Sequence, residues 1–140
     1  MIAKTIDDLQ VYQKALVGSV AVSALLKNPR LRKDYKLSDQ LADAADSVCS
    51  NISEGFGQQS DRKFAQYLFI ARGSANEVHT HVRAACHRGY ITDEEVEGVN
   101  PTYVEIGKML TRLIQYLRKC DRREHGTEDY DITFHGCLLY

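Results

Sequence analysis

The sequence predicts an all-α protein, an antiparallel up-down-up-down four-helix bundle with a short irregular C-terminal tail. Apolar residues recur at three- and four-residue steps through four long segments. No stretch alternates apolar and polar residues between turn residues, as a strand would. We expect the bundle to cover residues 1–123 and the tail to cover residues 124–140, because the apolar repeat stops after Arg123.

The first two predicted helices lie on either side of a basic connection. The first starts at residue 7 or 8 and ends at residue 27, because Asn28 precedes a proline and therefore disfavours helix. The second begins at Ser38, a good N-cap, and ends loosely at Gly55 and Gly57. The apolar residues at helical spacing that we expect in the core are Leu9, Tyr12, Leu16, Val20 and Leu26 in the first helix, and Leu41, Ala45, Val48, Ile52 and Phe56 in the second.

The third and fourth predicted helices have the most regular apolar repeats. The third begins after Ser60, another good N-cap, and ends before Gly89, which can adopt the left-handed conformation of a helix C-terminus. The fourth opens with a capping box formed by Thr92 and Glu95. The expected buried series are Phe64, Leu68, Ala71, Ala75, Val78, Val82 and Ala85 in the third helix, and Val96, Val99, Tyr103, Ile106, Leu110, Leu113 and Leu117 in the fourth.

Pro101 conflicts with an uninterrupted fourth helix, because proline removes a backbone hydrogen bond from a helix interior. Either the proline kinks one continuous helix, or Asn100 caps a new helix with Pro101 at its first position. The apolar series stays in phase across Pro101. The sequence therefore favours one kinked helix.

Composition excludes several functional classes. A formal net charge of −1 argues against a strongly basic nucleic-acid binder, although it allows a local basic patch. No apolar run approaches the ~20 residues that span a bilayer, and the first residues contain no apolar signal-peptide region. The four cysteines form no CxxC pair. We therefore expect a cytoplasmic protein with reduced thiols and no membrane partner.

A metal centre, an organic cofactor and enzyme activity are not expected. His79, His81, Cys86 and His87 are close in sequence, but His81 points to a different face and no carboxylate completes a ligand set. The chain contains no Glu-x-x-His pair of the kind that binds two metals in helical bundles. It also contains none of the glycine-rich, HExxH or GxSxG motifs of nucleotide-binding and hydrolytic sites.

The chain resembles the 23S rRNA-intervening-sequence protein family over about residues 7–119. Two segments carry most of this resemblance: Ser50-Asn51-Ile52-Ser53-Glu54-Gly55-Phe56-Gly57 and Tyr67-Leu68-Phe69-Ile70-Ala71-Arg72-Gly73-Ser74-Ala75-Asn76-Glu77. Pro101 and the tail depart from the family pattern. The resemblance implies a four-helix bundle, often a ring-like pentamer, with no assigned molecular role. A more distant similarity, to the accessory protein of diversity-generating retroelements, implies contact with reverse transcriptase and nucleic acid.

The first candidate site is a polar turn within the family-like segment, formed by Ser50, Asn51, Glu54 and Gly55. It is either a polar recognition site or a set of side chains that satisfies the frayed end of the second helix. The structural role is favoured, because a helix end with two glycines leaves backbone groups in need of partners.

The second candidate site is a run of small residues in the middle of the third helix, Gly73, Ser74 and Ala75. A glycine there costs about 1 kcal/mol relative to alanine, so something should offset that cost. We favour close packing of another helix, either within the bundle or between subunits. A ligand groove is the alternative.

The third candidate site is basic. In an up-down bundle the start of the third helix and the end of the fourth lie at the same end, so their basic residues should meet there. The residues expected to contact nucleic acid are Arg62, Lys63, Lys119, Arg122 and Arg123. The plainer interpretation is a solvated surface that also complements a helix C-terminus.

Two functional hypotheses follow. The first is a non-catalytic homo-oligomeric scaffold or interaction module, for which the resemblance suggests five subunits. Its faces would be complementary if the acidic second helix met the basic third helix of a neighbour. The second hypothesis is an accessory protein that binds RNA or DNA weakly through the basic bundle ends.

Overall fold

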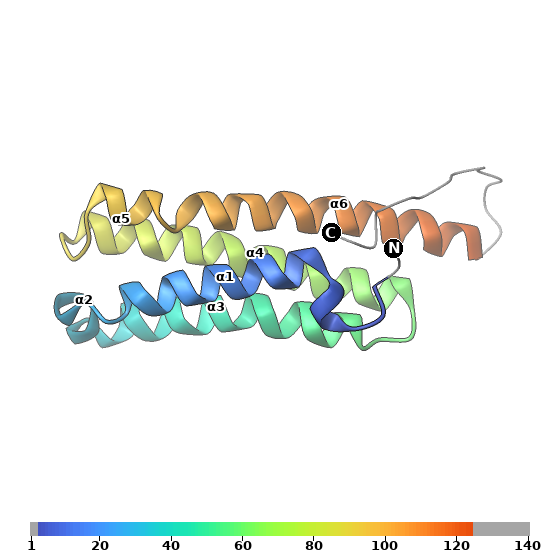
Figure 1. Ribbon diagram of the computed structural model, residues 1–140, viewed down its shortest axis with the longest axis horizontal. Helices are drawn as coiled ribbons and strands as arrows, with labels where there is room; N and C mark the ends of the chain where they lie inside the picture. Colours follow the sequence, from blue (N-terminus) through green and yellow to red (C-terminus); the bar gives the residue numbers. More distant parts are fainter. Residues whose placement is uncertain (1–2, 125–140) are drawn as a thin grey trace.

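The computed structural model describes residues 3–124, and every regular element in that range is a helix (Figure 1). Four long helices run along the long axis, and consecutive ones point in opposite directions: α1 (Gln10–Leu25), α3 (Tyr35–Phe56), α4 (Asp61–His87) and α6 (Asn100–Glu124). Three short elements complete the described chain: the 3₁₀ turn η1 (Ile6–Asp8), α2 (Pro29–Lys33) and α5 (Asp93–Glu97). The prediction of an all-α protein is confirmed for these residues.

Each long helix packs against two of the others. α3 lies between α1 and α4, and α6 also contacts both α1 and α4. α1 and α4 are therefore diagonal partners across the core, as are α3 and α6 (Figure 1). This arrangement leaves each helix with one outward face.

α4 follows the sequence prediction closely. The Ser60 side chain accepts a hydrogen bond from the Lys63 backbone N–H, which makes it the N-cap. Gly89 has a φ of +76°, as a left-handed C-terminal residue should. All seven predicted positions, from Phe64 to Ala85, are buried.

The core prediction for the first helix is correct for Leu9, which is fully buried, but wrong for Leu16 and Val20. The buried residues of α1 are Val11, Ala15, Gly18, Val22 and Leu25. Leu16 and Val20, which we expected in the core, are 42% and 71% exposed. The helix also begins later and ends earlier than predicted, at Gln10 and Leu25. Because α1 is apolar on nearly all sides, its spacing alone does not select a face.

The connection to the second helix holds an unpredicted element, α2, whose Leu31 is fully buried. Asn28 caps α2 through its side chain. Ser38 is not the N-cap of the following helix, because α3 begins at Tyr35 and Asp34 accepts from the Leu37 N–H. The Ser38 hydroxyl instead donates to the Leu31 carbonyl over 2.6 Å.

The fourth predicted helix is split rather than kinked. Thr92 and Glu95 form the expected capping box, but α5 ends at Glu97 and α6 begins at Asn100. Pro101 lacks the N–H that would bond the Glu97 carbonyl, so the helix is interrupted just before it. The apolar series of both pieces, from Val96 to Leu117, is nevertheless buried as predicted.

The far end of the chain is described only in part. Glu124, which we assigned to the tail, is the last residue of α6. The rest of the predicted tail, residues 125–140, lies outside the described residues. Among the helices of residues 3–124, none combines the length and the apolar character needed to cross a membrane.

Candidate functional site

The polar turn lies at the contact between α3 and α4. Asn51 donates to the Ser47 carbonyl over 2.8 Å and to the Ser47 hydroxyl over 2.9 Å. That hydroxyl pairs with the Ser74 hydroxyl of α4 over 2.8 Å. The Ser50 side chain also bonds the Ser47 carbonyl, over 3.4 Å, whereas the Glu54 side chain is exposed. The Ser50 and Asn51 side chains therefore bond within α3, and the Ser47 hydroxyl makes the link to Ser74 of α4.

Gly55 completes this contact by allowing α3 and α4 to approach. A Cβ atom on Gly55 would lie 2.8 Å from a ring carbon of Phe64 and 2.8 Å from the Cβ of Tyr67. Contacts that short are not tolerated, so the helices would have to separate. The glycine is thus required by packing within the chain.

The small residues of α4 face in two directions. Ser74 and Ala75 are buried, at 7% and 1% exposed. Gly73 faces outward, and a Cβ atom there would meet nothing within 4 Å. Gly107 of α6 is equally open. Packing within the chain therefore explains Ser74 and Ala75 but leaves the two open glycines without a reason.

A basic pocket lies on the surface between the start of α4 and the end of α6. Arg62 of α4 and two arginines of α6, Arg118 and Arg122, line it, together with Ala65, Gln66, Phe69 and Asp121. The guanidinium carbon of Arg118 lies 4.7 Å from the centroid of the Phe69 ring. The corresponding distance for Arg72 is 4.8 Å. Phe69 therefore holds two arginines by cation–π attraction.

A second pocket continues the same groove toward the middle of the molecule. Its basic residues are Arg72, Lys108 and Arg112. Arg72 also donates to the Thr111 hydroxyl over 3.2 Å, which links α4 to α6 across the groove. Arg112 forms an ion pair with Glu105 at 3.7 Å. We call these two pockets together the basic groove; six basic side chains and one acidic side chain line it.

The structure thus brings together only some of the predicted nucleic-acid contacts. Arg62 and Arg122 line the same pocket. Lys63 and Lys119 do not line it, and one guanidinium nitrogen of Arg123 is buried. Sequence reasoning missed Phe69 and Gln66, which have no charge but lie between the arginines on the surface of α4.

The opposite side of α4 carries a groove of different charge. Gln40, Asp43, Ala44 and Ser47 of α3 face Ile70, Ser74, Glu77 and His81 of α4. No lysine or arginine of residues 3–124 lines this pocket. Its volume, about 470 Å³, is close to the 400 Å³ of the arginine pocket, so the two differ in charge rather than in size.

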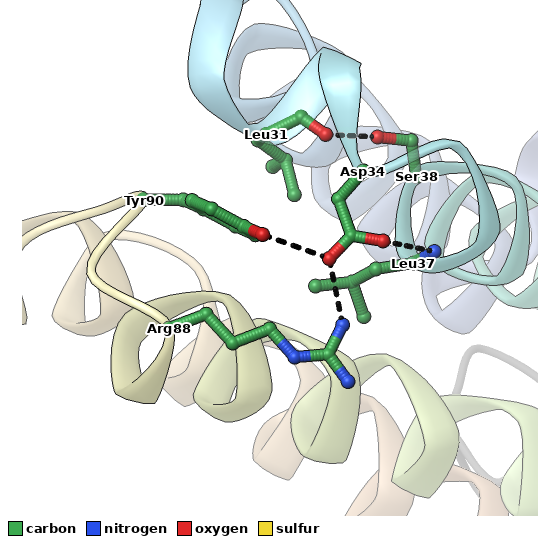
Figure 2. A network of polar contacts seen from close by, with 6 residues as sticks. All are labelled: Leu31, Asp34, Leu37, Ser38, Arg88 and Tyr90. Carbon is green, nitrogen blue, oxygen red and sulfur yellow. Dashed lines mark hydrogen bonds and ion pairs between the residues drawn. The ribbon is translucent and has the colours of Figure 1, made fainter.

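Two arginines at the other end of the molecule have structural partners, and Figure 2 shows the contacts of one of them, Arg88. The Asp34 carboxylate accepts from Arg88 over 2.8 Å and from the Tyr90 hydroxyl over 3.0 Å. The Tyr90 hydrogen bond, followed by those from the Leu37 N–H and from Arg88, holds the pKa of Asp34 below its ordinary value. Arg30 donates to the Gly89 carbonyl over 2.8 Å. These contacts fasten the α2–α3 corner to the turn after α4.

No metal centre was expected around His79, His81, Cys86 and His87. Within residues 3–124, no group of three or more His, Cys, Asp and Glu side chains is placed to hold a metal ion. The Cys86 thiol instead donates to Asp93 over 3.3 Å, and this bond raises the pKa of the thiol.

Comparisons with known proteins place the chain in a family. The family model described as 23S rRNA-intervening sequence protein matches residues 7–112. The chain belongs to this family. None of the curated proteins matches it. A solved structure of a protein of unknown function from the S23 ribosomal protein family of Bacteroides thetaiotaomicron is 31% identical and superposes with a TM-score of 0.68, covering 75% of this chain and 98% of that chain.

Only part of the basic groove lies within the residues that match the 23S rRNA-intervening sequence protein family. Arg62, Phe69 and Arg72 lie inside the matched residues 7–112. Arg118 and Arg122 lie beyond them. The arginine pocket is therefore completed by a part of α6 that lies outside the matched residues.

Proposed function

We propose that this protein is a non-catalytic homo-oligomeric scaffold, built as an antiparallel up-down-up-down four-helix bundle. The outward face of α1 is the observation that carries the proposal. Leu16, Val17 and Val20 are 42%, 58% and 71% exposed on that face. Lys14 is the one charged residue in the 16 residues of α1. A helix that is apolar on all sides is normally buried, so we expect another protein surface to bury the exposed side chains of this face.

In a second copy, the outward face of α4, the helix diagonal to α1, is suited to cover the exposed face of α1. Ile70 is 54% exposed there, and the neighbouring Gly73 leaves space for a closely approaching helix. Contact between two different faces is heterologous, and it closes into a ring when the rotation between copies allows. The family resemblance favours five copies in that ring. An open glycine on α4 then has a purpose that the single chain does not supply.

Light scattering coupled to gel filtration tests the proposal. The wild-type protein should have a mass several times 15.8 kDa, with about five subunits. Replacing Val17→Asp and Val20→Asp together should give a helical monomer, because both side chains are exposed in the single chain. The matched control is Ser53→Asp with Gln115→Asp, which adds the same charge at exposed positions of α3 and α6. A wild-type monomer at micromolar concentration would refute the scaffold.

A further inference from the structure

We propose that the basic groove between α4 and α6 binds the phosphodiester backbone of single-stranded nucleic acid. Its lining of six basic side chains against one acidic side chain contrasts with the chain's net charge of −1. Phosphate contacts by arginine and lysine supply most of the affinity of proteins for nucleic acid regardless of sequence. This inference does not depend on the scaffold function, because it concerns a groove that the single chain forms by itself.

Two arginines of the groove are oriented before any ligand arrives. Arg118 and Arg72 are held against the Phe69 ring, so less side-chain freedom is lost when they bind. Within residues 3–124, neither Arg62 nor Arg118 forms an ion pair with an acidic side chain. A guanidinium can bond phosphate oxygens in pairs, which favours arginine at such a site.

The length of the groove favours a polymer over a single phosphate. Arg62 and Arg72 are ten residues apart on α4, and Arg112 and Arg122 are ten residues apart on α6. At 1.5 Å per residue each pair spans about 15 Å of helix. A row of cations along a groove is typical of proteins that follow a single-stranded backbone.

The competing occupant is the acidic groove of a second copy. That surface offers Asp43 and Glu77 as its acidic side chains. Asp121 lies in the basic groove and Glu105 pairs with its Arg112, so two further carboxylates offset at most two of the four remaining positive charges, whereas a nucleic-acid strand brings one negative charge per nucleotide. Gln66, Asn76 and Thr111 also line the basic groove and add neutral hydrogen-bonding groups beside the cations. The charge balance therefore favours the strand.

Fluorescence anisotropy with labelled oligouridylate and oligothymidylate of about 20 nucleotides tests the inference, with salt varied between about 25 and 200 mM. Arg62→Ala with Arg118→Ala should bind roughly a hundredfold more weakly at low salt, about tenfold for each charged hydrogen bond lost. The slope of log affinity against log salt should become shallower by about 1.4, since each single-strand contact contributes about 0.7.

The matched control removes the same charge at the opposite end. Lys33→Ala with Lys36→Ala changes two basic residues of the pocket beside Asp34 and should leave binding within about twofold, because charges far from the strand are screened by salt. Phe69→Leu keeps every charge but frees Arg72 and Arg118, and it should weaken binding by about tenfold. Thermal melts followed by circular dichroism confirm that each variant is folded.

Three results would overturn the inference. The first is no binding of either oligonucleotide by the folded wild-type protein at the lowest salt. The second is equal weakening by the arginine pair and by the lysine pair, which would indicate a diffuse surface attraction. The third is a reduced mass of the arginine variant in light scattering with unchanged oligonucleotide affinity, which would make the groove a subunit contact. A wild-type monomer that still binds RNA refutes only the scaffold.

Discussion

The inward face of α1 and the outward face of α4 each carry a glycine in the middle of a long helix, and the two glycines differ in their surroundings. A Cβ atom on Gly18 would lie 2.9 Å from the ring of Tyr103, whereas a Cβ atom on Gly73 would meet nothing within 4 Å. Packing within the chain explains the first glycine. The second costs helix stability without any return inside the monomer. The proposed contact with a second copy would give Gly73 a role that the monomer does not.

Among the substitutions that test this comparison, Gly18→Ala should change the free energy of unfolding most. The new methyl group meets the phenol ring of Tyr103, which is rigid and only 2% exposed, so α1 or α6 must shift. We expect the free energy of unfolding to fall by about 1–3 kcal/mol, as for other overpacked cores. Urea denaturation measures the loss.

A double-mutant cycle with Tyr103→Leu separates this clash from other effects of the substitution. Leucine shortens the side chain at position 103, so Gly18→Ala should cost much less in that background than in the wild type. Equal costs in both backgrounds would show that the Tyr103 ring does not limit the approach of α1.

The same contrast shows how far the sequence determines the fold. In α4 the apolar residues occupy one stripe, so spacing alone selected the buried face from Phe64 to Ala85 correctly. In α1 the apolar residues surround the helix, and spacing fits Leu16 and Val20 as well as Val11 and Val22. The tight contact at Gly18 decides between them, and it depends on a tyrosine 85 residues away. The wrong prediction therefore lies where the proposed interface lies.

The candidate site was predictable only in its location. The predicted up-down order of the helices places Arg62 and Arg122 at the same end, and both line one pocket. The rotation of each helix decides which side chains meet across the groove, and spacing within one helix does not reveal it. The contact of Arg118 with Phe69 was therefore not predicted. The break before Pro101 was also missed, because an apolar series that stays in phase does not report a lost backbone hydrogen bond.

Gly73→Ala should act in the opposite direction from Gly18→Ala on the folding of the single chain. Nothing within 4 Å opposes the new methyl group, and alanine is the better helix former, so the unfolding free energy should rise by about 0.5–1 kcal/mol. At the same time, the methyl group should obstruct a neighbouring helix and lower the mass in light scattering at low micromolar concentration.

The unfolding free energy reports the effect of Gly73 on helix stability, and the mass in light scattering reports its effect on a subunit contact. Gly107→Ala is the matched control, because Gly107 is as open as Gly73 but lies on α6, outside the proposed contact. It should stabilise the helix to the same degree and leave the assembly intact. If Gly73→Ala kept the wild-type mass across the dilution series, Gly73 would have no part in a subunit contact.

Asp34→Asn should give the smallest effect, because the carboxylate and its partner Arg88 are partly exposed and such ion pairs contribute little. Asparagine is also a good N-cap, so the start of α3 should persist. The variant therefore removes the negative charge of Asp34 and keeps the shape of the α2–α3 corner shown in Figure 2.

The dependence of the melting temperature on pH tests whether the Asp34 charge contributes to stability. The pKa of Asp34 is lower in the folded state than its ordinary value, because Tyr90, Leu37 and Arg88 donate to the ionised carboxylate. Its contribution to stability is therefore present above the unfolded-state pKa, about 3.9, and is lost as pH falls through the folded-state value. Wild type should melt slightly above Asp34→Asn at pH 7, and the difference should disappear toward about pH 2.

Tyr90→Phe removes the leading hydrogen bond and should shrink the pH-dependent difference. Parallel melting profiles for wild type and Asp34→Asn from pH 7 down would show instead that the corner is held by its shape and that the charge of Asp34 adds nothing.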